Sequence, residues 1–78
     1  MEKKSYRDIL MEYFGGDIAS IVGCGLDRAG GHYTCDVQNK AIALYEKNID
    51  EFNRLPIGAR RQIIADFVTS GIKPDGYV

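Results

Sequence analysis

Between Asp36 and Pro56 the chain carries one continuous amphipathic pattern, and this segment constrains the fold more than any other. Apolar residues recur there every three or four positions, while charged and amide side chains fill the opposite arc. That periodicity predicts a long helix over residues 37–55, with Asp36 as its N-cap and Pro56 as its end. The predicted buried arc comprises Val37, Ala41, Ile42, Leu44, Tyr45, Ile49, Phe52 and Leu55.

Three shorter segments have the same periodicity. The first follows the N-cap Ser5 and ends at Gly15–Gly16, and its expected core positions are Tyr6, Ile9, Leu10, Tyr13 and Phe14. The second runs from residue 18 to about residue 24, because Gly23 and Gly25 would each cost about 1 kcal/mol in a helix interior. The last begins after Pro56, ends at Gly71, and buries Ile57, Ile63, Ile64, Phe67 and Val68.

These patterns predict a mainly α fold: a small four-helix domain over residues 1–78, with a Gly-rich irregular connector at residues 27–35. An α+β alternative stays open. In it, residues 20–25 pair with residues 32–37 as a short hairpin, since a short apolar run fits a strand as well as a helix.

The stretch around the connector holds both cysteines and the single histidine of the chain: Cys24, His32 and Cys35. A structural zinc site needs four ligands, usually in closely spaced pairs, and only His32 and Cys35 are close together. A Cys–His nucleophile would also need an orienting group and an oxyanion site on a rigid scaffold. We therefore expect no metal, no other cofactor and no catalytic residues.

The charge balance argues against several function classes. Ten basic and eleven acidic residues give a net charge of −1, and neither half of the chain is strongly basic or acidic. Proteins that bind nucleic-acid backbones usually have an excess of Lys and Arg. No apolar run approaches the roughly 18 residues of a membrane span, and the N-terminus does not resemble a signal peptide. We expect a cytoplasmic protein, whose two cysteines are thiols.

The segment from Tyr6 to Asp27 resembles the opening of Cro-type repressors. The resemblance runs through Phe14–Gly15, the helix at 18–24, and then Gly25, Leu26 and Asp27. It implies a helix-turn-helix DNA-binding regulator, with a recognition helix after Asp27 that presents Arg28, His32 and Gln38 to base edges. The sequence departs from that pattern at Gly30–Gly31, which would lie in the middle of the recognition helix.

The leading hypothesis is a small non-enzymatic module that binds another protein. The residues expected to contact the partner are Arg54, Arg60, Arg61, Tyr33, His32 and Tyr77, because Arg and Tyr are enriched at interfaces. For Arg60 the alternative is a side chain at the rim of the core, and for Tyr77 a side chain folded over the core. We also expect a homodimer, because a long apolar arc in so short a chain needs further cover. An accessory or inhibitor protein of a phage or mobile element is a hypothesis based on size.

Overall fold

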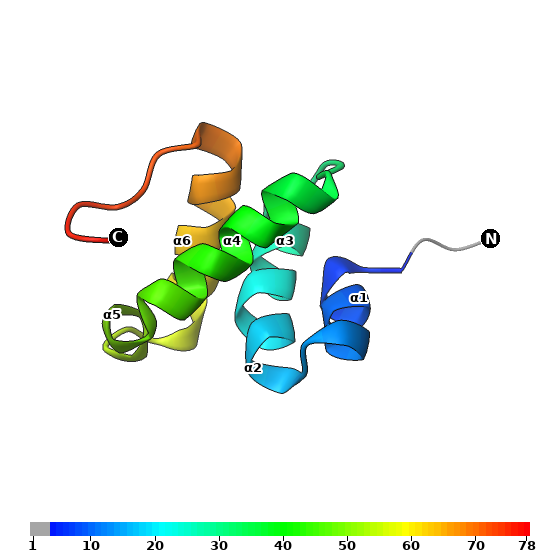
Figure 1. Ribbon diagram of the computed structural model, residues 1–78, viewed down its shortest axis with the longest axis horizontal. Coiled ribbons are helices and arrows are strands. Elements are labelled where there is room, and N and C mark those ends of the chain that lie inside the picture. Colours follow the sequence, from blue (N-terminus) through cyan, green and yellow to red (C-terminus); the bar gives the residue numbers. More distant parts are fainter. Residues whose placement is uncertain (1–3) are drawn as a thin grey trace.

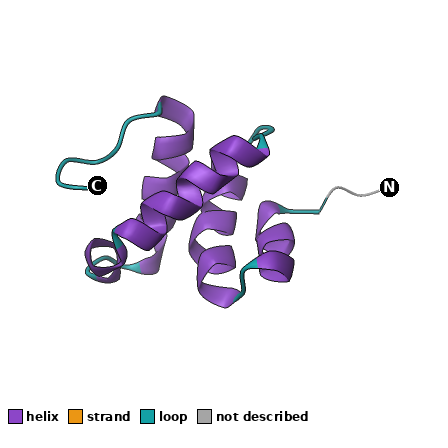
Figure 2. Cartoon of the chain, viewed as in Figure 1, coloured by secondary structure: helices purple, strands orange, loops and turns teal. Residues whose placement is uncertain are grey.

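The computed structural model describes residues 4–78, and all of its regular secondary structure is helical (Figure 2). The mainly α fold is therefore confirmed. Residues 4–78 contain no strand, so the alternative hairpin around residues 20–37 is wrong. In chain order the elements are α1 (Tyr6–Tyr13), α2 (Gly16–Ile18), the π-helical turn η1 (Ala19–Gly23), α3 (Cys24–Ala29), α4 (Cys35–Lys47), α5 (Ile49–Asn53) and α6 (Ile57–Ser70).

Helix α1 begins as the sequence predicts. The Ser5 hydroxyl accepts a hydrogen bond of 3.1 Å from the Asp8 N–H. A second, distant cap was not predicted: the Asp27 carboxylate accepts the backbone N–H groups of Tyr6 at 2.8 Å and Arg7 at 3.2 Å. A carboxylate at a helix N-terminus satisfies free N–H groups and complements the helix dipole. Asp27 thus fixes the start of α1 against α3.

The second helix extends well beyond the predicted end near residue 24. Elements α2, η1 and α3 form one unbroken helical run over residues 16–29, with a π-helical turn at its centre. The two glycines that were expected to end the helix lie inside it, and both are buried. A Cβ at Gly23 would lie 2.6 Å from the Arg7 Cα, and one at Gly25 would lie 2.6 Å from the Ile64 Cβ. The glycines allow close packing against α1 and α6, which offsets their low helix propensity.

The predicted helix over residues 37–55 is wrong as a single helix. It is two helices, α4 and α5, and the first begins at Cys35 with Thr34 rather than Asp36 as its N-cap. The break lies at Asn48, whose backbone is not helical. The Asn48 side-chain amide donates to the Leu44 carbonyl at 2.8 Å, and its Oδ1 accepts the Val78 N–H at 2.8 Å. This buried side chain supplies hydrogen bonds where the helix ladder is interrupted.

The core lies where η1, α3, α4, α5 and α6 meet, and α1 adds Leu10 to it. Its largest fully buried side chains are Phe52, Leu26, Ile64 and Val22. In Figure 1, α4 crosses in front of α3 and α6, while α1 lies on the side of the domain away from α6. Helix α6 ends as predicted at Gly71, whose φ of 74° favours glycine, and residues 71–78 then turn back toward α5.

Several residues expected in the core are exposed instead. Tyr13 is 75% exposed and Phe14 is 50% exposed, although both follow the apolar periodicity of the first helix. Ile49 and Ile57 are also exposed, at 43% and 47%. The helical period shows which face is apolar but not how far the neighbouring helix reaches along it. Here α1 packs mainly on η1 and α3, and these contacts leave Tyr13 and Phe14 at its C-terminal end exposed.

Candidate protein-binding groove

The arginines near Pro56 form hydrogen bonds within the chain. Arg60 donates from Nε to the Leu55 carbonyl at 2.7 Å and is partly buried. Arg61 donates from Nε to the Ser20 carbonyl at 2.8 Å and so joins α6 to η1. Arg54 forms an exposed ion pair with Glu51 at 3.3 Å. Arg60 and Arg61 therefore each have a structural role, and the most exposed of the three guanidinium groups is that of Arg54.

Tyr77 folds back over the core. Its ring meets Phe52 edge-on with the ring centroids 5.5 Å apart, and it is partly buried. Burial raises the pKa of the Tyr77 hydroxyl above its ordinary value near 10, and the Glu51 carboxylate raises it further. Tyr77 thus holds the C-terminal tail against α5.

The connector is shorter than predicted, because α3 continues to Ala29 and only residues 30–34 lie between helices. Tyr33 anchors it: its N–H donates to the Tyr6 hydroxyl at 2.7 Å, and its own hydroxyl donates to the Gly30 carbonyl at 2.7 Å. The exposed His32 lies beside it. The expected partner residues therefore occupy separate places, with His32 and Tyr33 near the start of α1 and Arg54, Arg60 and Tyr77 around α5.

The exposed aromatic residues of α1 border a groove that the sequence did not reveal. The first part of this groove has a volume of about 520 Å³ and lies between α1 and α4. Its residues are Ile9, Leu10, Tyr13, Phe14, Cys35, Gln38, Asn39 and Ile42. The floor is aliphatic, the polar groups on the α4 side are neutral amides and a thiol, and the α1 rim is aromatic.

A second hollow of about 400 Å³ lies next to the first, and Phe14 lines both. It is lined by Phe14, Gly16, Asp17, Ile18, Tyr45, Glu46, Ile49 and Asn53. Together the two hollows form what we call the α1–α4 groove. Along α4 it extends from Cys35 to Glu46, a rise of about 16 Å at 1.5 Å per residue. Among the described residues that line it, the charged ones are Asp17 and Glu46, so one end of the groove is acidic.

Sequence reasoning missed this groove because it assigned Tyr13 and Phe14 to the core. One signal was present. Both residues occupy the last turn before Gly15–Gly16, where the chain turns away and little can cover the helix end. An aromatic pair at such a position is as compatible with an exposed surface as with a core.

Cys24 and Cys35 are free, and within residues 4–78 no three His, Cys, Asp or Glu side chains lie close enough to hold a metal ion. The residues that resemble a Cro-type turn, Gly25 to Asp27, lie inside α3, and residues 30–34 after it are not helical. The expected recognition helix is therefore not formed.

Comparisons with known proteins yield no relative. No protein-family model matches the chain, no curated protein matches it, and no solved structure matches it. In the described part of the chain, none of the helices has the length and apolar character needed to cross a membrane.

Proposed function

We propose that this chain is a non-catalytic module that binds another protein, and that the α1–α4 groove is the surface it uses. The observation that carries the proposal is the exposure of Tyr13 and Phe14 along an aliphatic groove. Single exposed apolar residues are ordinary, but a contiguous apolar hollow edged by aromatic side chains is typical of an interaction site. Exposed aromatic rings also lose little conformational entropy when a partner covers them.

The shape of the groove indicates what it would bind. A trough about 16 Å long matches three turns of an α-helix, each turn rising 5.4 Å. An amphipathic helix could place its apolar residues over Ile9 and Ile42. A basic residue at one end of that helix would face Asp17 and Glu46.

Self-association is part of the proposal. In a two-fold dimer through this surface, each copy would cover Tyr13 and Phe14 of the other, because the same patch contributes to both sides. The net charge of −1 offers little repulsion between copies. A cytoplasmic location, and an accessory or inhibitor role for a phage or mobile element, belong to the proposal as well. The support for that role is a binding mode that occupies a partner's surface.

The test is site-specific photocrosslinking in living cells. A photoreactive phenylalanine analogue replaces Phe14 in one variant and Ile72 in another. Ile72 is the matched control, because it is 73% exposed, apolar, and located in the C-terminal tail outside the groove. We expect one discrete crosslinked protein, or a covalent dimer, from position 14 and not from position 72. Equal crosslinking from both positions, or none from position 14, would contradict the proposal.

A further inference from the structure

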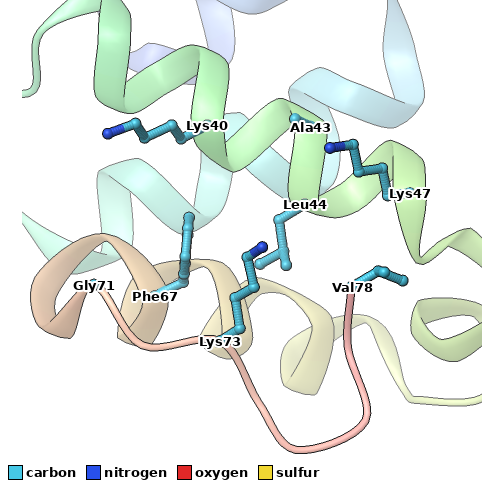
Figure 3. Close-up of a pocket in the computed structure, with 8 residues that line it drawn as sticks. All are labelled: Lys40, Ala43, Leu44, Lys47, Phe67, Gly71, Lys73 and Val78. Atoms are coloured by element: carbon cyan, nitrogen blue, oxygen red, sulfur yellow. The ribbon is translucent and has the colours of Figure 1, made fainter.

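The opposite side of α4 carries a second pocket, which differs in charge from the α1–α4 groove. It has a volume of about 350 Å³ and lies between α4, α6 and the C-terminal tail (Figure 3). Leu44 and Phe67 form its apolar floor, and Lys40, Lys47 and Lys73 stand around it. Three of the five lysines of a chain with a net charge of −1 are thus gathered at one pocket.

The helical register explains why two of these lysines lie together. Lys40 and Lys47 are seven residues apart, or about two turns and 10 Å along the same face of α4. Leu44 lies between them, and its side chain points into the pocket (Figure 3). The apolar floor is therefore flanked along its length by ammonium groups.

The tail supplies the third lysine. Gly71 ends α6 and turns the chain, so that residues 72–78 run back beside the pocket. The far end of the tail is fixed where the Val78 N–H donates to Asn48 Oδ1 at 2.8 Å. In Figure 3 the Lys73 side chain reaches from this segment toward Leu44.

These positive charges are poorly compensated. No Asp or Glu is among the described residues that line the pocket. Lys40 pairs with Asp36 at 3.5 Å, but both side chains are largely exposed and such a pair contributes only tenths of a kcal/mol. In the described part of the chain neither Lys47 nor Lys73 forms an ion pair. An anionic ligand would therefore gain new contacts without breaking strong ones.

We propose that this pocket binds an acidic peptide segment of a partner protein, with an apolar side chain on Leu44 and Phe67 and carboxylates on both sides of it paired with the lysines. The spacing favours a peptide over a single small acid. The rise of about 10 Å along α4 from Lys40 to Lys47 corresponds to about three residues of extended chain, so one segment running along α4 can present a carboxylate to each lysine. The site is independent of the α1–α4 groove, and either can fail without the other.

Fluorescence polarisation with a defined probe tests this. The probe is a labelled heptapeptide with one leucine, two glutamates on each side of it and a glycine at each end. We expect saturable binding that weakens as salt is raised, because the contacts are partly electrostatic. Replacing the leucine by serine, or the glutamates by glutamine, is expected to weaken binding about tenfold or more.

Charge reversal locates the site. Lys47→Glu and Lys73→Glu are each expected to weaken binding of the probe about tenfold or more. Lys4→Glu makes the same change of charge far from the pocket, beside α1, and is expected to have little effect. Thermal melts check that each variant is folded, and amide NMR shifts on binding should cluster in residues 40–47 and 71–78.

Several results would overturn the proposal. They are absence of binding up to millimolar probe, equal loss of binding in Lys4→Glu, and tight binding of the glutamine peptide. Binding of decanoate at these lysines without binding of the peptide would also overturn it, since the pocket would then be a site for a small amphiphilic acid.

Discussion

Adding one methyl group at Gly23 should destabilise the fold, although alanine is the better helix former. A Cβ at this position would lie 2.6 Å from the Arg7 Cα and 2.9 Å from the Arg7 N. Both are backbone atoms, so no side-chain rotation can relieve the clash. Helix α1 would have to move outward by roughly 1 Å before an ordinary van der Waals separation of about 3.5 Å is reached.

The size of the expected loss of stability follows from this movement of α1. Overpacking of this kind costs about 1–3 kcal/mol, and displacement of the backbone places Gly23→Ala at the upper end. The same movement stretches the hydrogen bonds from Tyr6 and Arg7 to Asp27, because those N–H groups belong to the displaced turn. Because alanine has a higher helix propensity than glycine, the substitution also stabilises the helix by about 1 kcal/mol. We expect a net loss of about 2 kcal/mol and a fall in Tm of roughly 8–16 °C, at 4–8 °C per kcal/mol for a domain of this size.

Thermal and urea unfolding followed by circular dichroism measure this loss. The control is Gly58→Ala, a helical position in α6 where an added Cβ meets nothing within 4 Å. The control should be neutral or stabilise the protein by up to about 1 kcal/mol. If Gly23→Ala melted at or above the temperature of the parent protein, the argument that this glycine permits close packing of α1 would be refuted.

Four further predictions concern the core, the tail and assembly. Phe52→Ala should cost about 3–5 kcal/mol in urea unfolding, because Phe52 is fully buried against Tyr45 and Tyr77, and an unchanged midpoint would mean it is not a core residue. Asn48→Ala should release the tail, seen as faster amide exchange at Val78, and unchanged exchange would refute the pairing. Tyr77 should ionise later than an exposed tyrosine in an absorbance titration. Because its folded pKa is raised, its contribution to stability is complete below pH 10 and lost as the pH rises through that raised pKa. Sedimentation equilibrium at tens of micromolar should give a mass near twice 8.7 kDa, and 8.7 kDa throughout would exclude the dimer.

The helical segments can be predicted from the sequence. The ends of two of them, the second helix and the long helix over residues 37–55, cannot. Ser5, Pro56 and Gly71 act locally, so the start of α1 and both ends of α6 were correctly predicted. The predicted end of the second helix near residue 24 is wrong because Gly23 and Gly25 allow close contacts with Arg7 and Ile64. These contact residues are distant in sequence, so the local pattern does not show them. Asn48 breaks the long helix through a partner 30 residues away, and no local pattern shows that pairing.

The candidate site was harder to foresee for a related reason. A hydrophobic period identifies the apolar face of a helix but not which neighbouring element buries that face. Whether Tyr13 and Phe14 are buried depends on where α4 lies. In the sequence, the arginines near Pro56 suggest a partner contact only by their residue type. Arg60 and Arg61 hydrogen-bond to the backbone of Leu55 and Ser20, and residue type alone cannot separate such a role from a partner contact.

The most direct test of the α1–α4 groove is the affinity for whichever protein crosslinks at position 14, measured by titration calorimetry with Phe14→Ala, Tyr13→Ala and the control Ile72→Ala. All three residues are substantially exposed, so none of the changes should alter the melting temperature by more than a few degrees. We predict that Phe14→Ala and Tyr13→Ala each weaken binding about tenfold or more, as truncation of a buried interface aromatic does, while Ile72→Ala leaves it unchanged. Unchanged affinity in both groove variants, with the fold intact, would contradict the claim that this groove is the binding surface.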